Sequence, residues 1–376
     1  MPRFLQETDT RFFAAVALLV ALGLIFLSSV SAPLAYERYG SRSYYLVHQL
    51  WSGVLPGAVL LVLAARLRRP VLERCGLWAL AGSVVLLIAV LIPGLGVTRG
   101  GAQSWLDIGF VTFQPAELAK VGLILALASW ATVRRPLWFH PKAWARGFLP
   151  FLGVLGGVLG IIGLQPDLGT MLIIAAIGVA MAFVGGMQLR HLGLLALGGI
   201  AALTALIAAA PYRVARLTAF LHPELDPQGI GYQVNQALLA VGSGGWFGVG
   251  LGHSRQKFAF LPEVISDSIF AIVAEEIGFI FSLAFLALIA YVIARVLRNA
   301  MDATDEFDRL VLVGIAAWWG VQSVVNIGAM VGMLPLTGLP LPFVSSGGTA
   351  LAVSLGAAGI VLNLSRTRGT AARHRR

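Results

Sequence analysis

Charged residues are scarce in this chain. Asp, Glu, Lys and Arg make up only 12% of its 376 residues, about half of the roughly 25% that is usual in soluble domains. Hydrophobic residues account for 58%, and the mean hydropathy is +0.85. This balance excludes an ordinary soluble domain and predicts a protein that crosses a membrane several times.

Cysteine is nearly absent. Cys75 is the single one, which excludes a disulfide within the chain and leaves this thiol the role of a small apolar helix residue. Low-complexity segments and a long internal repeat are missing as well. We therefore expect one membrane domain over residues 1–365, followed by a basic cytoplasmic tail at residues 366–376.

What the chain does contain is a series of long apolar runs. A hydrocarbon core about 30 Å thick needs roughly 20 apolar residues per helix, and ten runs come close to that length. We predict an all-α polytopic membrane protein with about ten transmembrane helices, at residues 12–32, 44–65, 75–93, 115–133, 147–164, 168–186, 191–210, 267–294, 310–333 and 347–364.

Basic residues gather on one side of this predicted topology. With ten helices both termini share a side, and 19 of the 27 Lys and Arg residues fall there. By the positive-inside rule this side is the cytoplasm. The net charge of +10 then reflects membrane orientation and attraction to anionic lipid, so we expect no nucleic acid partner.

The only long segment between predicted helices, at about residues 211–266, lies on the opposite, extracytoplasmic side. Segments of this length are usually functional or disordered. Its aromatic residues, apolar residues and glycines argue against disorder. We expect short helices and tight turns packed against the membrane surface.

Two carboxylates, Glu263 and Asp267, stand at the start of the helix predicted at 267–294, and Glu275 and Glu276 lie within it. Carboxylates are costly inside a membrane, so an intramembrane acid indicates a functional site. Asp267 can reach water and a substrate hydroxyl and is the candidate for chemistry, with helix capping as the alternative. Glu275 and Glu276 are adjacent and point to different sides of a helix, so we expect only one of them to face a cavity.

Further polar residues are predicted at the same outer face, on separate loops and helix ends. They carry both signs of charge, which favours one polar cavity open to the outside over a proton path across the membrane. The candidates for binding a substrate in this cavity are Glu117, Lys120, Asp167, Arg213, Arg216, Gln233, Lys257, Glu263, Ser345 and Ser346.

Several of these candidates have a structural alternative. Glu117 and Lys120 are three residues apart on one helix and can form a buried pair. Asp167 follows a proline at a helix start, which suits a capping role. Arg213 and Arg216 match phosphate oxygens in shape, but they can equally contact lipid headgroups.

The stretch 338–349 is rich in Gly, Pro and Ser and directly precedes the last predicted helix. Free backbone N–H groups at a helix start can bind an anion, which makes Ser345 and Ser346 candidates for substrate contact. A tight turn that allows close helix packing is the alternative.

Taken in order, several short motifs resemble the SEDS family (shape, elongation, division and sporulation), which includes FtsW, RodA and SpoVE. They cover nearly the whole chain, at residues 105–109 (WLDIG), 113–120 (FQPAELAK), 165–170 (QPDLGT), 231–233 (GYQ), 236–238 (QAL), 250–252 (GLG), 254–257 (SRQK), 261–263 (LPE) with Asp267, 274–278 (AEEIG), 326–328 (NIG) and 338–343 (GLPLPF). The run SRQK is more similar to the division branch, FtsW, than to the elongation branch, RodA.

The resemblance implies a peptidoglycan glycosyltransferase that polymerises lipid II into glycan strands at the outer face of the bacterial cytoplasmic membrane. It places the family's essential aspartate on Asp267, the expected general base, and the family's Glu and Lys of the fourth helix on Glu117 and Lys120. It also implies a class B penicillin-binding transpeptidase as partner, together with other membrane proteins of the divisome or elongasome.

Glycan polymerisation also needs charge stabilisation for the departing lipid pyrophosphate. We expect Lys120 and the loop arginines to supply it, together with a divalent cation, Mg²⁺ or Mn²⁺. No organic cofactor is expected.

The chain also departs from the family pattern. It has Ile265, Ser266 and Ser268 around the aspartate where the family usually has His, Thr and Phe, and Ser104 where Arg is usual. Two rival functions stay open: a transporter or flippase for the lipid-linked precursor, and a non-catalytic scaffold for division partners. A transporter favours polar sites near the membrane midplane with access from both sides, whereas the polar residues here cluster outward.

Overall fold

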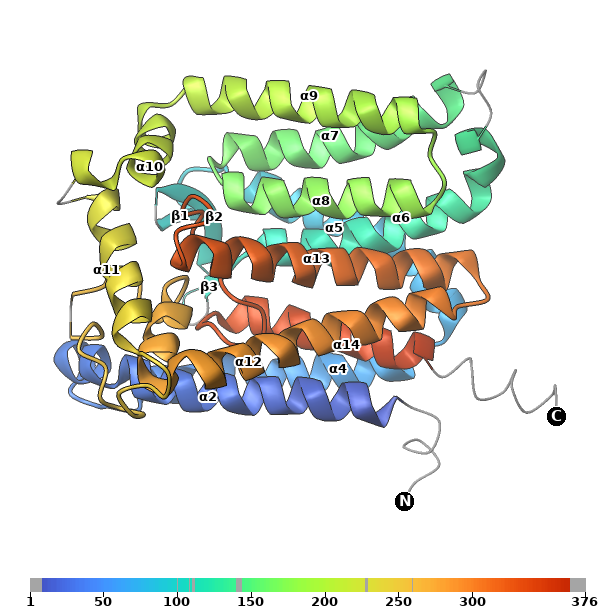
Figure 1. Cartoon of the computed structure of the whole chain (residues 1–376). Helices are drawn as coiled ribbons and strands as arrows, with labels where there is room; N and C mark the ends of the chain where they lie inside the picture. Colours follow the sequence, from blue (N-terminus) through green and yellow to red (C-terminus); the bar gives the residue numbers. More distant parts are fainter. Residues whose placement is uncertain are drawn as a thin grey trace.

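The structure is a computed structural model that describes residues 9–99, 101–107, 109, 112–139, 144–226, 229–258 and 260–365. Its long helices lie side by side in one bundle (Figure 1). The start of α2 (Thr10–Tyr39) and the end of α14 (Gly348–Ser365) lie at the same end of this bundle. The tail predicted at residues 366–376 lies outside the described residues.

All ten predicted runs form helices, with bounds that differ by a few residues. Besides α2 and α14 they are α3 (Tyr44–Gln49) continued by the π-helical turn η1 (Leu50–Val54) and α4 (Leu55–Arg66), α5 (Arg69–Ala89), α6 (Pro115–Phe139), α7 (Phe148–Leu164), α8 (Leu168–Val184), α9 (Leu189–Ala208), α12 (Ile269–Met301) and α13 (Glu306–Met330). A 3₁₀ turn, η2 (Trp144–Arg146), precedes α7. Within the described residues, eight of these segments are long and apolar enough to cross a membrane, and α7 and α8 have 17 residues each.

Short polar residues fix where several of these helices begin and end. The side chains of Asp9, Asp167 and Asp305 accept hydrogen bonds from backbone N–H groups of the first turns of α2, α8 and α13, which satisfies donors that a helix start leaves unpaired. Gly40 ends α2 in the left-handed conformation, and its N–H donates to the Tyr36 carbonyl. These caps explain why the apolar runs end where they do.

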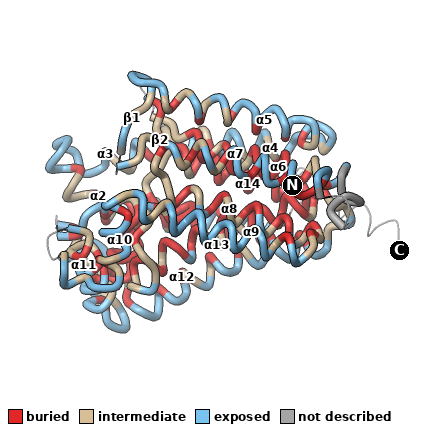
Figure 2. Tube along the Cα trace, turned by 90° about the horizontal axis from the view of Figure 1, so that it is seen from above, coloured by how far each residue is buried: buried red, intermediate tan, exposed pale blue. Residues whose placement is uncertain are grey.

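The core of the bundle lies along α6, α13 and α14, which are mostly buried, whereas α9 is largely exposed. Figure 2 shows exposed residues along the outer side of α5 and buried residues on the sides that the helices turn toward one another. Glycine allows the closest approaches, since a Cβ at Gly359 of α14 would lie 2.3 Å from the carbonyl oxygen of Leu61 in α4. Small residues at such crossings are typical of helix packing in membranes.

A small antiparallel sheet, absent from the sequence prediction, connects α5 to α6. Its strands are β1 (Gly96–Arg99), β2 (Ala102–Asp107) and β3 (Thr112–Phe113), in the order β1-β2-β3. Strands this short give no clear alternation of polar and apolar residues. The sheet sits at the end of the bundle opposite the start of α2 (Figure 1).

The long segment predicted at residues 211–266 lies at the same end as the sheet (Figure 1). It contains α10 (Pro211–Leu221), the 3₁₀ turn η3 (Pro223–Leu225) and α11 (Ile230–Ser243), followed by turns up to residue 268. This confirms the prediction of short helices and tight turns.

The helix α12 is interrupted near its first third. Gly278 has φ +75° and ψ −179°, a conformation that is not helical. The turns at residues 245–250 fill the interruption: the N–H groups of Val249 and Gly250 donate to the carbonyls of Glu275 and Glu276, at 3.0 Å each. Backbone groups that the break in α12 leaves unpaired are thus satisfied by the turns at residues 245–250.

Candidate functional site

Asp267 lies in a series of turns at residues 261–268, just before α12 begins at Ile269. It is only 8% exposed. The hydroxyl of Ser266 lies 3.3 Å from its Oδ1, and Nδ2 of Asn326 in α13 donates to its backbone carbonyl at 2.8 Å. The N-cap of α12 is Ser268, without a side-chain capping bond, so helix capping does not account for Asp267.

The electrostatic surroundings of Asp267 favour a carboxyl group that can take up a proton. Burial, and then the nearby Glu263 carboxylate, raise the pKa of Asp267 to about 6, and the charge of Arg216 opposes the shift. Ser266 connects the two acids, since its hydroxyl also lies 2.8 Å from Oε2 of Glu263. A carboxyl group with a raised pKa in a buried site is a candidate general base.

The segment 338–347 packs directly against this acidic segment. The N–H of Ser346 donates to the carbonyl of Ile265 at 2.8 Å. Ser345 is buried, and its hydroxyl accepts a hydrogen bond from the N–H of Leu341 within the same turn. Gln49 of α3 holds the other side of the turn through the N–H of Gly347 and the carbonyl of Ser345. Ser345 therefore shapes a tight turn, and Ser346 lies beside the segment that carries Asp267.

Glu117 and Lys120 form the predicted pair. Nζ of Lys120 lies 2.7 Å from Oε1 of Glu117, and the two side chains are 0% and 3% exposed. Nζ also donates to Oε1 of Gln322 at 3.2 Å and lies 4.6 Å from the centre of the Trp318 ring. Nε2 of Gln322 in turn donates to the carbonyl of Pro340 at 2.7 Å. The pair is therefore enclosed between α6 and α13 and is connected to the segment 338–347.

Because this pair is buried, removing one partner should destabilise the protein. We expect Lys120→Met to lower the free energy of unfolding by about 3–5 kcal/mol, since it leaves the Glu117 charge buried and uncompensated. The double variant Glu117→Gln with Lys120→Met should recover a large part of this loss. Thermal unfolding in detergent measures both, and equal losses in the single and the double variant would contradict a paired role.

The other candidates of the outer face divide between structural contacts and the surroundings of Asp267. Asp167 caps α8 and also accepts a bond from Gln114 at 3.4 Å. Arg213 is buried, and its guanidinium donates to the carbonyl of Leu206 in α9 at 2.8 Å. Gln233 of α11, by contrast, donates to the hydroxyl of Ser268 at 3.1 Å, next to Asp267.

Lys257 is engaged away from Asp267. Its Nζ lies 2.8 Å from Oε1 of Glu276, which also accepts a bond from Ser29 of α2. Glu275 accepts bonds from the Ser254 hydroxyl and the Arg255 N–H. Both glutamates thus bind the turns at residues 254–257, and Glu276 also binds the neighbouring helix α2. The sequence analysis expected only one of them to face a cavity, and it did not foresee that one set of turns contacts both.

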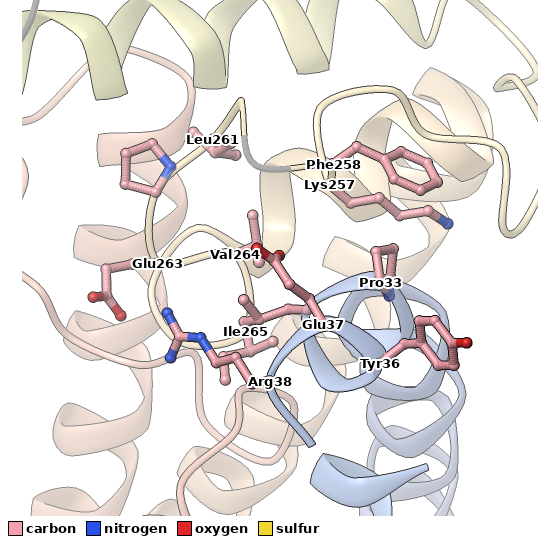
Figure 3. Close-up of a pocket in the computed structure, with 12 residues that line it drawn as sticks. Pro33, Tyr36, Glu37, Arg38, Lys257, Phe258, Leu261, Glu263, Val264 and Ile265 are labelled. Carbon is pink, nitrogen blue, oxygen red and sulfur yellow. The ribbon is translucent and has the colours of Figure 1, made fainter. Parts of the chain in front are cut away.

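A cavity of about 540 Å³ opens between the end of α2 and residues 257–265. Figure 3 shows the Arg38 guanidinium on the same side of this cavity as the Glu263 carboxylate. Glu37 and Lys257 also line the cavity, and most of the other lining residues, among them Leu261 and Val264, are apolar. A concave site with a mainly apolar lining and a few charged groups is typical of small-molecule binding, and Glu263 connects it with Asp267.

The site that these contacts define consists of Asp267 and Glu263, with Arg216, Gln233 and Ser346 around them. Sequence reasoning named all five, but it missed the part played by two amides of α13, Gln322 and Asn326. The signal that could have found them is their spacing of four residues in an apolar helix, which places both on one face.

Two carboxylates of this site, those of Glu263 and Asp267, are available to bind a divalent cation. Among the described residues, no three His, Cys, Asp or Glu side chains gather closely enough to hold a metal ion. Glu263 and Asp267 do lie together, on either side of the Ser266 hydroxyl. Mg²⁺ is commonly held by one or two carboxylates together with substrate phosphates, so the residues fit a cation that enters with a phosphorylated substrate.

Comparisons with known proteins agree with this architecture. The sequence profile of a family described as "Cell cycle protein", FtsW/RodA/SpoVE, matches residues 9–370. The chain is 38% identical to stage V sporulation protein E of Bacillus subtilis over 350 residues, covering 93% of this chain and 94% of that protein. It is 41% identical to a probable peptidoglycan glycosyltransferase FtsW of a Thioalkalivibrio species over 365 residues, covering 96% and 90%.

Two solved structures are similar over nearly the whole chain. One is described as "Structural coordination of polymerization and crosslinking by a peptidoglycan synthase complex". It matches with a TM-score of 0.79 and 31% identity, covering 96% of this chain and 98% of that one. The rod shape determining protein RodA of Thermus thermophilus matches with a TM-score of 0.71 and 30% identity, covering 96% and 97%.

Proposed function

Because the chain belongs to the FtsW/RodA/SpoVE family, we propose that it is a peptidoglycan glycosyltransferase that polymerises lipid II at the outer face of the cytoplasmic membrane. Several relatives carry the name of probable peptidoglycan glycosyltransferase. The observation that carries the proposal is the placement of Asp267: a buried carboxyl group with a raised pKa, beside a second acid and a cavity, at one end of a membrane bundle.

In the proposed reaction Asp267 is the general base. A hydroxyl of one sugar attacks the anomeric carbon of a second lipid-linked sugar, so that a carbon–oxygen bond forms. The bond from that carbon to the lipid pyrophosphate breaks, and the pyrophosphate leaves with its electron pair. Asp267 takes up the hydroxyl proton as the bond forms. Burial, and then the Glu263 carboxylate, keep the pKa of Asp267 high enough for this transfer near neutral pH.

The departing pyrophosphate carries negative charge that the site must stabilise. Arg216 is half-buried and close enough to influence the charge of Asp267, so we assign it this role. Lys120 is enclosed by Glu117, Gln322 and Trp318. It stabilises the site indirectly, because Gln322 also binds the carbonyl of Pro340 in the segment 338–347. A divalent cation, Mg²⁺ or Mn²⁺, would be held by Glu263 together with the pyrophosphate and would neutralise part of its charge.

The proposal includes a partner and an orientation. A class B penicillin-binding transpeptidase would crosslink the strands, in keeping with the polymerization and crosslinking named for the similar complex. Both ends of the described chain lie at one end of the bundle (Figure 1), and on the basis of the positive-inside rule we propose that this end faces the cytoplasm. The site would then face outward, where lipid II is consumed.

The direct test is synthesis of glycan strands from purified lipid II by the purified protein, with and without a class B transpeptidase and with Mg²⁺ or Mn²⁺. We expect polymer in at least one of these conditions. If no polymer forms in any of them, translocation of lipid II across vesicle membranes is measured next. Translocation would support the transporter alternative. If lipid II is not translocated either, a non-catalytic scaffold is the remaining hypothesis.

The pH dependence of the reaction gives a second test. A base acts only when it is deprotonated, and the pKa of Asp267 is raised to about 6. We expect kcat/KM to fall about tenfold for each pH unit below about 6 and to be level just above it. An ordinary aspartate would keep the rate level down to about pH 4, and that result would contradict the assignment.

A further inference from the structure

One side-chain amide holds the backbone of Asp267 in place. Nδ2 of Asn326, in the buried part of α13, donates to the carbonyl of Asp267 at 2.8 Å and to the carbonyl of Leu339 at 2.7 Å. Asn326 is 2% exposed. Both partners are acceptors, and only the NH₂ group of the amide has two hydrogens to donate, so this orientation of the side chain is the one that satisfies them.

These two bonds join three parts of the chain that are far apart in sequence. The turns at 261–268 carry Asp267, the segment 338–347 carries Leu339, and α13 provides the rigid support. Gln322, one helical turn before Asn326, binds the same segment through the carbonyl of Pro340 at 2.7 Å. The hydrogen bond from the Ser346 N–H to the Ile265 carbonyl joins the segment 338–347 directly to the turns at 261–268.

We propose that Asn326 is a positioning residue, which fixes the carboxyl group of Asp267 relative to the segment 338–347 and thereby sets the catalytic geometry. The inference rests on the proposed function, because it concerns the base of that reaction. Asn326 acts through the backbone and does not itself take up a proton. A displacement of a catalytic group by about 1 Å can lower a rate by about 10²-fold, and loss of both bonds frees the segment for movements of that size.

The chain offers a matched control for the loss of two such bonds. Nδ2 of Asn363 in α14 also donates to two carbonyls, those of Ala64 at 2.8 Å and Leu67 at 2.7 Å. These lie at the end of α4, at the end of the bundle opposite Asp267 (Figure 1). Asn326→Ala and Asn363→Ala therefore remove the same number and type of bonds, and only the first removes them from the site.

We expect Asn326→Ala to lower kcat by about 10²-fold with KM for lipid II changed less than threefold, whereas Asn363→Ala keeps at least half of the wild-type rate. Asn326→Asp conserves the size of the side chain but replaces the donor by an acceptor, and it should lose activity like Asn326→Ala.

Hydrogen–deuterium exchange gives a measurement that does not depend on activity. Peptides covering residues 261–268 should exchange at least tenfold faster in Asn326→Ala than in wild type or in Asn363→Ala. Unchanged exchange in these peptides, or equal rates of polymerisation in the two alanine variants, would overturn the positioning role. If the wild-type protein makes no polymer but these peptides still exchange faster in Asn326→Ala than in wild type, the positioning of Asp267 is upheld and the proposed reaction is refuted.

Discussion

Asp267→Asn should lower the rate of glycan polymerisation by about 10²–10⁴-fold, the range that general base catalysis supplies. The amide has nearly the size of the carboxyl group and can still accept the bond from Ser266, but it cannot take up the hydroxyl proton. The measurement is polymerisation of lipid II by the purified variant under the conditions in which the wild-type protein is active.

The same substitution should stabilise the folded protein at neutral pH. The pKa of Asp267 is raised to about 6 in the folded state, above its value of about 4 in an unfolded chain. The folded protein therefore ionises this group at a cost that grows between about pH 4 and 6 and is constant above. We expect a higher melting temperature for Asp267→Asn at pH 7.5 and a smaller difference at pH 5.

Glu224→Gln is the matched control for the loss of a carboxylate. Glu224 is exposed in the turn η3, between α10 and α11, where it pairs with His222 at 3.2 Å. Its replacement should leave both rate and stability close to wild type. An Asp267→Asn protein that is folded and keeps more than a tenth of the wild-type rate would contradict Asp267 as the base.

Gly278→Val should prevent the protein from reaching its folded state. The backbone of Gly278, at φ +75° and ψ −179°, is a conformation that is essentially restricted to glycine and costs other residues about 1–3 kcal/mol. A Cβ would also lie 2.1 Å from the backbone nitrogen of Gly248. Gly248 has φ +81°, and the next two residues, Val249 and Gly250, donate to the carbonyls of Glu275 and Glu276, so Gly248 cannot move aside without loss of the turns at 245–250.

The two effects together exceed about 4 kcal/mol, which is rare for a single substitution. Fluorescence-detected size-exclusion chromatography of the detergent extract measures the folded fraction, and we expect no symmetrical peak for Gly278→Val. Gly320→Ala is the control, because a Cβ there makes only ordinary contacts with Ile293, at 3.7 Å and beyond. A normal elution profile for Gly278→Val would show that α12 can close its interruption.

The relation of sequence to structure differs between the bundle and the site. The ten helices followed from apolar runs of about membrane length, and the capping alternative for Asp167 followed from its place at a helix start. The three-stranded sheet did not, because two to six residues of strand carry no readable period. The contacts of Glu275 and Glu276 did not follow either, because both bind turns at residues 254–257 whose path around α12 depends on the tertiary structure.

The sequence by itself determined that this chain spans a membrane with about ten helices, and it identified Glu263 and Asp267 as two acids at the start of one of them. Composition and periodicity carry that information because burial in lipid acts on each residue locally. Pairing of Glu117 with Lys120 was foreseen as well, since the two residues are three apart on one helix. Only the tertiary structure decided the contacts between distant segments: Lys257 pairs with Glu276, 19 residues away, and Asn326 donates to the carbonyl of Asp267, 59 residues away. Such contacts depend on how the helices pack, and no local pattern encodes them.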